Sequence, residues 1–227
     1  MYPITIIIFF LYCWGFGRGL GFFVKESEDF FERNLMRLGI GLGAVPAFGL
    51  LLNVLRIPLD WRIFLAVSIL PILISIVQGI RKKSGFLHGL KGIKFNLYVV
   101  LMLLLFSVSL YMYVKGSFSY PYLEDDDPWS HALGIKYVAV EKTVFTPIRI
   151  FHYLDPYPPT YDMLLGILHQ TNNSVYWTIK FFNALIVSLS IVFFYFFAKV
   201  FTKSSKKAIF STFALFAIPA FLTHFIW

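Results

Sequence analysis

Residues 95–114 read FNLYVVLMLLLFSVSLYMYV, a stretch of 20 residues without a charged side chain. A helix of this length spans about 30 Å, the thickness of the hydrocarbon core of a bilayer. Helix is the expected conformation, because backbone groups in lipid must form hydrogen bonds within their own segment. The stretch therefore predicts a transmembrane helix.

The whole chain has the composition of an integral membrane protein. Of its 227 residues, 58% are hydrophobic and 14% are charged, whereas soluble domains are about half apolar and about a quarter charged. The first apolar stretch lacks a basic start and is rich in aromatic residues, so we interpret it as a retained span rather than a signal peptide. We predict an all-α membrane protein with about six transmembrane helices, at 2–24, 38–55, 61–80, 95–114, 179–199 and 208–227.

The basic residues predict how the helices are oriented. With the N-terminus outside the cytoplasm, the cytoplasmic segments carry twelve of the 20 basic and four of the 12 acidic residues. The outer segments carry seven basic and eight acidic residues. Cytoplasmic loops are enriched in Lys and Arg, so the N-terminus and the loop at 116–176 are predicted to be extracytoplasmic. The cytoplasmic basic residues then account for the net charge of +8, and no nucleic-acid partner is expected. A prokaryotic plasma membrane is the expected location.

Two features of the first spans call for interpretation. Arg18 lies within the first span, where the alternatives are snorkelling or local pairing on one side and a functional role on the other. Glycine also recurs at every second position in two runs. Neither run follows a predicted strand, so we interpret the glycines as sites of close helix approach rather than nucleotide binding. The runs are Gly15, Gly17, Gly19 and Gly21, and Gly39, Gly41 and Gly43.

The loop at 116–176 is unusually long, and loops of more than about 15 residues are often functional. It contains four consecutive acids, Glu124 to Asp127, followed by Pro128. Aspartate oxygens are ligands for Mg²⁺ or Mn²⁺, and a carboxylate at a membrane surface can act as a general base. The alternatives are a solvated acidic turn and a helix cap, with Asp127 as the N-cap and Pro128 in the first helical position.

Two short amphipathic helices are predicted inside this loop. Because they have no soluble core of their own, we expect both to lie on the bilayer surface. His131 follows Asp127 by one helical turn, and its role as a metal ligand, a phosphate contact or a surface residue is open. The apolar positions are Trp129, Leu133, Tyr137, Val140 and Val144 in the first helix, and Met163, Leu164, Ile167 and Leu168 in the second, which starts near Pro159.

From residue 95 onward, the order of these features resembles the GT-C superfamily of polytopic membrane glycosyltransferases. Within it the chain is most similar to the catalytic subunit of oligosaccharyltransferase and its archaeal relatives. A span leads into an external loop with an acidic motif, a helix containing Tyr137, a proline-rich turn, a short helix and two further spans. The motif is Asp125-Asp126-Asp127-Pro128-Trp129-Ser130-His131, the turn is Asp155-Pro156-Tyr157-Pro158-Pro159-Thr160, and the last span contains Ala217-Ile218-Pro219-Ala220.

The resemblance implies a function and a set of site residues. It implies transfer of a sugar or oligosaccharide from a polyprenyl-phosphate-linked donor to an extracytoplasmic protein or glycan acceptor. Asp127, the aspartate before Pro and an aromatic residue, is implied to be catalytic and to bind a divalent cation, Mg²⁺ or Mn²⁺, with Asp125 as the next candidate. The candidates for substrate binding are Trp129, His131, Lys136 and Arg149, the last two for the donor phosphate.

The resemblance covers residues 95–227, which we interpret as the start of a GT-C-like membrane domain. Residues 1–94 form a separate N-terminal membrane module of three spans. The family continues through further helices and a second external acidic motif, so we expect this chain to be an N-terminal portion that is incomplete on its own. The alternative is a non-catalytic polytopic membrane protein, either an assembly subunit or a transporter module. A transporter should carry charges near the midplane of its spans, for which Arg18 is the one candidate, and the acids lie in the loop, which argues against this alternative.

Overall fold

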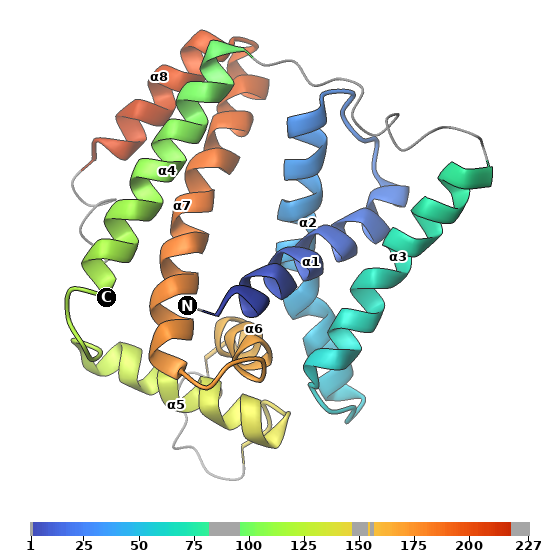
Figure 1. Cartoon of the computed structure of the whole chain (residues 1–227), viewed down its shortest axis with the longest axis vertical. Coiled ribbons are helices and arrows are strands. Elements are labelled where there is room, and N and C mark those ends of the chain that lie inside the picture. The colour runs from blue at the N-terminus through green and yellow to red at the C-terminus, as the bar shows by residue number, and fades with distance from the viewer. Residues whose placement is uncertain (1, 82–95, 147–153, 155–156, 219–227) are drawn as a thin grey trace. The chain divides into compact units, whose positions relative to one another are not determined.

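The computed structural model describes residues 2–81, 96–146, 154 and 157–218, and this part of the chain is helical, without strands (Figure 1). Five helical segments in it are long and apolar enough to cross a membrane. The chain is therefore an all-helical protein with several helices of membrane-spanning length, as predicted. The five segments are Pro3–Phe23, Phe30–Val54, Trp61–Gln78, Leu97–Ser117 and Val175–Thr202.

The sixth predicted span, at 208–227, is described only in part. Helix α8 (Ser205–Phe216) begins after Ser204, whose hydroxyl accepts a hydrogen bond from the Lys207 backbone N–H. The helix ends three residues before Pro219, and proline disfavours helical conformation in the residue before it. Because residues 219–227 lie outside the described part, the sixth span stays a prediction.

The chain groups into two compact units. Unit 1 comprises Met1–Lys94 and Ser130–Val175, and unit 2 comprises Phe95–Trp129 and Tyr176–Trp227. The predicted domain boundary after residue 94 coincides with a boundary between these units. Residues 130–175 group with the three N-terminal spans, although the sequence interpretation assigned them to the second domain.

Glycines bring the first three helices of unit 1 together. Helix α1 (Pro3–Leu20), followed by the short η1 (Gly21–Phe23), packs against both α2 (Phe30–Val54) and α3 (Trp61–Arg81) (Figure 1). A Cβ atom on Gly17 would stand 1.7 Å from the Arg37 carbonyl oxygen, and one on Gly41 would stand 1.6 Å from the Cys13 carbonyl oxygen. These separations are too short for any side chain, so the predicted role of the glycine runs in close helix approach is confirmed at both positions.

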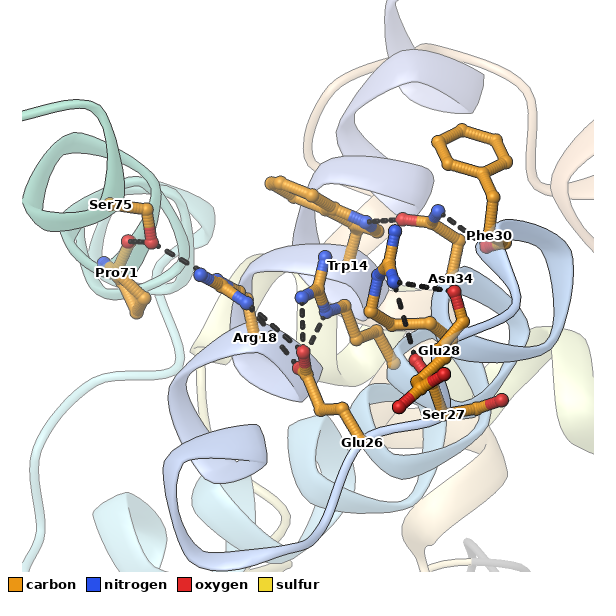
Figure 2. Close-up of polar contacts among 11 residues, drawn as sticks. Trp14, Arg18, Glu26, Ser27, Glu28, Phe30, Asn34, Pro71 and Ser75 are labelled. Carbon is orange, nitrogen blue, oxygen red and sulfur yellow. Dashed lines mark hydrogen bonds and ion pairs between the residues drawn. The ribbon is translucent and has the colours of Figure 1, made fainter. Parts of the chain in front are cut away.

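Arg18 is paired locally, which was one of the two predicted alternatives. Its Nε donates to Ser75 Oγ at 3.0 Å, and its Nη1 lies 3.3 Å from the Glu26 carboxylate (Figure 2). Arg37 of α2 is 8% exposed and donates from Nε and Nη2 to the two Glu26 oxygens at 2.8 and 2.5 Å. Burial disfavours the charged carboxylate, but the hydrogen bonds and charge of Arg37, with the charge of Arg18, hold the pKa of Glu26 below its ordinary value. The cluster thus ties the connection after α1 to α2 and α3.

Three basic residues adopt left-handed backbone conformations within two residues of the end of a helix. The φ angles are 57° at Arg56, 56° at Lys142 and 52° at Lys203. Glycine usually occupies this position, because a Cβ atom there costs about 1 kcal/mol. Lys142 has a compensating contact, since its Nζ donates to Asp60 Oδ2 at 2.5 Å.

We expect Arg56→Gly to raise the free energy of unfolding by about 1 kcal/mol, because it removes the backbone strain. Thermal unfolding of the purified protein in detergent measures the change. In Lys142→Gly the same gain should be offset by the lost contact with Asp60. Arg56→Ala is the control: it removes the same side chain but keeps the Cβ atom, so an equal gain in this variant would contradict the explanation.

The two predicted loop helices are present as α5 (Asp126–Glu141) and α6 (Thr160–His169). The prediction that Asp127 is the N-cap is wrong, because α5 begins two residues earlier than expected. Asp127 and Pro128 lie in the first turn, and Asp125 Oδ1 accepts a hydrogen bond from the Asp126 backbone N–H at 2.7 Å. Proline is tolerated there because N–H groups in the first turn have no acceptor within the helix.

The prediction that both helices lie on the bilayer surface is wrong for α6. All residues from Asp162 to Leu168 are buried, with Met163 lying against Gly49 of α2 and Gly166 against Val138 of α5. The predicted stripe of α5 is largely exposed, and this helix instead buries the side that includes Val138. Exposed positions of the stripe are Trp129, Leu133 and Val140, and the buried apolar positions of α5 are Ala132, Ile135 and Val138.

Unit 2 contains α4 (Leu97–Ser117), α7 (Val175–Thr202) and α8. Helices α4 and α7 are packed together by Tyr113, Ala184 and Val187. The hydroxyl groups of Ser109 and Ser188 form a buried hydrogen bond of 3.3 Å between the same helices. Figure 1 shows α8 beside α4, and the two helices are in contact.

Candidate functional site

The acidic run Glu124–Asp127 lies in unit 2, shortly after the end of α4. All four acidic residues are exposed, whereas the preceding Leu123 is 4% exposed. Trp129 Nε1 donates to the Leu123 carbonyl oxygen at 3.1 Å, and its ring meets Tyr176 edge-on at 5.6 Å. Trp129, a predicted substrate-binding residue, thus fixes the turn that presents the acids to solvent.

A buried lysine supports the same turn from α7. Lys180 is 3% exposed, donates from Nζ to the Tyr120 carbonyl oxygen at 2.6 Å and lies 5.8 Å from the centre of the Phe118 ring. It also interacts electrostatically with Glu124. A buried ammonium group needs such partners to offset its lost hydration. Sequence reasoning counted Lys180 only as an outer basic residue, although a charge near the start of a span is itself a functional signal.

Asp125 and Asp127 are the predicted metal ligands and catalytic residues. Across the described residues, no group of three or more His, Cys, Asp or Glu side chains is arranged to hold a metal ion. Mg²⁺ commonly uses only one or two protein carboxylates and completes its coordination with waters and substrate phosphates. Asp125 and Asp127 are both exposed at the start of α5.

A histidine–aspartate pair lies in unit 1. His131 Nδ1 and Asp162 Oδ1 are 2.6 Å apart, and the side-chain exposures are 26% and 1%. Asp162 Oδ2 is buried and has no hydrogen-bond partner among the described residues. A Cβ atom on Gly134 would stand 2.1 Å from this oxygen, so glycine makes room for the carboxyl group.

The surroundings of the pair shift the pKa of the Asp162 carboxyl group and that of the neighbouring Tyr161 phenol. Burial raises the pKa of Asp162, and the hydrogen bond and charge of His131 offset this effect only in part. The Tyr161 ring lies edge-on to His131 at 5.0 Å. Burial, with the charge of Asp162 beside it, raises the pKa of the Tyr161 phenol, which therefore stays neutral at physiological pH. Asp162 was not predicted, because 31 residues separate it from His131.

The remaining predicted residues are Lys136 and Arg149. Lys136 is exposed on α5, and Arg149 lies outside the described residues. An open cavity of about 580 Å³ in unit 1 lies near the ends of α2 and α5, and none of the predicted site residues that the structure describes lines it. Its lining consists of Asn53, Val54, Arg56, Ile57, Pro58, Glu141, Lys142, Thr143 and Phe145.

The predicted site residues thus fall into two clusters that share helix α5. Asp125, Asp127 and Trp129 belong to unit 2, whereas His131 belongs to unit 1 with Asp162. Comparisons of the chain with protein-family models, curated proteins and solved structures find no match.

Proposed function

We propose that this chain is a membrane glycosyltransferase that moves a sugar or oligosaccharide from a polyprenyl-phosphate-linked donor to an extracytoplasmic acceptor. The observation that carries the proposal is the exposed acidic run Glu124–Asp127, at the start of α5 and shortly after an apolar helix of membrane-spanning length. The resemblance in the order of motifs supports it. The predicted orientation adds that the acids face the acceptor side of the membrane.

The chemistry of such a transfer suits this arrangement. A donor with a polyprenyl tail partitions into the bilayer, and its phosphate lies at the membrane surface. The phosphate gains negative charge as it leaves the sugar, and a bound divalent cation would stabilise that charge. Asp125 and Asp127 would hold the cation. Trp129 and Lys180 keep the turn before them in a fixed conformation through contacts with Leu123 and Tyr120.

We expect Asp127→Asn and Asp125→Asn, made separately in the protein expressed from the complete gene, to lower sugar transfer by about 100-fold or more, the usual effect of removing a catalytic group. The measurement is transfer from short-chain polyprenyl-phosphate sugars in lipid nanodiscs. Glu141→Gln is the matched control, because Glu141 is an exposed acid at the other end of α5. Full transfer by both aspartate variants would overturn the assignment.

The same preparation distinguishes the proposal from a non-catalytic role as an assembly subunit or transporter module. Under the proposal, millimolar Mg²⁺ or Mn²⁺ should protect the Glu124–Asp127 turn from proteolysis, and the double variant Asp125→Asn/Asp127→Asn should lose this protection. Absence of both metal protection and sugar transfer in the unmodified protein would favour the non-catalytic alternative.

A further inference from the structure

The Asp162 carboxyl group is unusual for its position in the fold. Residues 162–168 of α6 are all buried, and Asp162 is the one ionisable residue among them. A carboxyl group with one oxygen lacking a hydrogen-bond partner is costly to bury, and an apolar residue would fill the same space without that cost. The hydrogen bond to His131 at 2.6 Å is a contact that an apolar residue at position 162 could not make.

Gly134 is a second, independent observation about this pair, because its position leaves room for the Asp162 carboxyl group. It lies between His131 and Tyr137 on α5, where its missing side chain leaves the space that Asp162 Oδ2 occupies. Glycine within a helix costs about 1 kcal/mol relative to alanine. Two locally unfavourable residues, a buried aspartate and a helical glycine, therefore combine to hold one histidine ring in a fixed orientation.

We propose that His131, oriented by Asp162, takes the proton from a hydroxyl acceptor during sugar transfer, so that the acceptor is a hydroxyl group rather than a carboxamide. This inference rests on the proposed function. His131 is the catalytic residue in it, and Asp162 is a positioning residue. About a quarter of the His131 side chain is exposed, which gives an acceptor access to the ring.

The pairing of Nδ1 with a carboxylate determines which ring nitrogen can act as the base. When Asp162 Oδ1 accepts the Nδ1–H hydrogen bond, Nε2 carries the lone pair of the neutral ring. The acceptor oxygen forms a bond to the anomeric carbon of the sugar while the bond from that carbon to the donor phosphate oxygen breaks. The phosphate leaves with the electron pair, and the hydroxyl proton passes to Nε2. Asp162 then stabilises the imidazolium ion.

A hydroxyl acceptor suits this base better than a carboxamide does. The lone pair of a neutral carboxamide nitrogen is delocalised into its carbonyl group, so this nitrogen is a weak nucleophile while the amide stays planar. A hydroxyl oxygen instead becomes a stronger nucleophile as its proton leaves, which is the step that a positioned histidine accelerates.

The test compares the unmodified protein from the complete gene with His131→Gln and Asp162→Asn in nanodiscs. Donors are farnesyl-phosphate-linked glucose, mannose and N-acetylglucosamine. Acceptors are octyl glucoside and an asparagine-containing peptide, and mass spectrometry identifies the atom that receives the sugar. We expect sugar on hydroxyl groups, and a fall in kcat of about 100-fold in His131→Gln with an unchanged KM for the donor. Asp162→Asn should lower kcat by at least about tenfold and change the pH profile, because the ring loses its orientation and charge partner.

His169→Gln is the control, since His169 lies in the same unit and its ring bonds to Asn172, three residues away, at 3.1 Å. Thermal unfolding of every variant distinguishes a loss of catalysis from a loss of folding. If Asp162→Asn does not fold, the activity of His131→Gln alone tests the proposal. Transfer by the unmodified protein, with full activity in His131→Gln or with sugar only on asparagine, would overturn this inference and leave the proposed function standing. No transfer from any donor by the unmodified protein would overturn both.

Discussion

Gly41→Ala should destabilise the three-helix packing of unit 1 by about 3 kcal/mol or more. Adding a methylene group to a well-packed core costs about 1–3 kcal/mol when side chains can move aside. Here the new Cβ atom would stand 1.6 Å from the Cys13 carbonyl oxygen, which is backbone in a neighbouring helix and cannot rotate away. The two helices would have to separate, and the contacts around Gly17 on the same interface would be lost with them.

Gly43→Ala is the matched control for this prediction. Gly43 lies in the same helix, and within the described part of the chain no atom from beyond its own helical backbone stands within 4 Å of the position that its Cβ would take. Because alanine favours helix over glycine by about 1 kcal/mol, this variant should be as stable as the original protein or more stable. Thermal unfolding in detergent, followed by circular dichroism, measures both. Equal losses at the two positions would show that the helices are not in close contact at Gly41.

Glu26→Gln should cost about 2–3 kcal/mol of unfolding free energy, which is below the penalty for breaking a fully buried ion pair because Glu26 is 24% exposed. The loss arises because Arg37, at 8% exposure, keeps its charge without the carboxylate that it contacts with two nitrogens. Adding Arg37→Met to Glu26→Gln should recover part of the loss, since the most deeply buried charge of the cluster is then removed as well. A double-mutant cycle measured by thermal unfolding gives the coupling between the two residues.

The pH dependence of stability provides a second measurement of the same pair. The pKa of Glu26 is lower in the folded protein than its ordinary value of 4.5. Its contribution is therefore present in full above pH 4.5 and is lost as the pH falls through the lower folded value. Glu26→Gln should lack this loss, whereas Glu28→Gln, at an exposed neighbour, should keep it. Identical acid profiles in the protein and in Glu26→Gln would contradict the assigned role.

Several parts of the fold could be predicted because they depend on local patterns. Charge-free stretches of about 20 residues predict helices of membrane-spanning length, and five such helices are present in the described residues. The two short helices after the acidic run follow from apolar spacing, and both are found. The start of α5 was misplaced by two residues, because a run of four acids provides several capping residues and Pro128 is tolerated anywhere in the first turn.

The burial of α6 was not predictable from its own pattern. Spacing identifies an apolar face, but the same face can rest on lipid or on protein. Here Gly49 of α2 and Val138 of α5 provide the protein surface. Residues in other helices determine whether this apolar face contacts protein or lipid, so the sequence of α6 alone does not predict its burial.

The sequence by itself determined that the chain is helical, that it has membrane-spanning segments and that an acidic run follows the fourth of these. Hydrophobic length and side-chain type are properties of a segment and need no partner. Only the tertiary structure decided which polar groups meet: His131 with Asp162, Lys180 with the Tyr120 carbonyl group, and two arginines with Glu26. The first two pairings join residues 31 and 60 positions apart, and such contacts depend on how helices pack, which no local periodicity encodes.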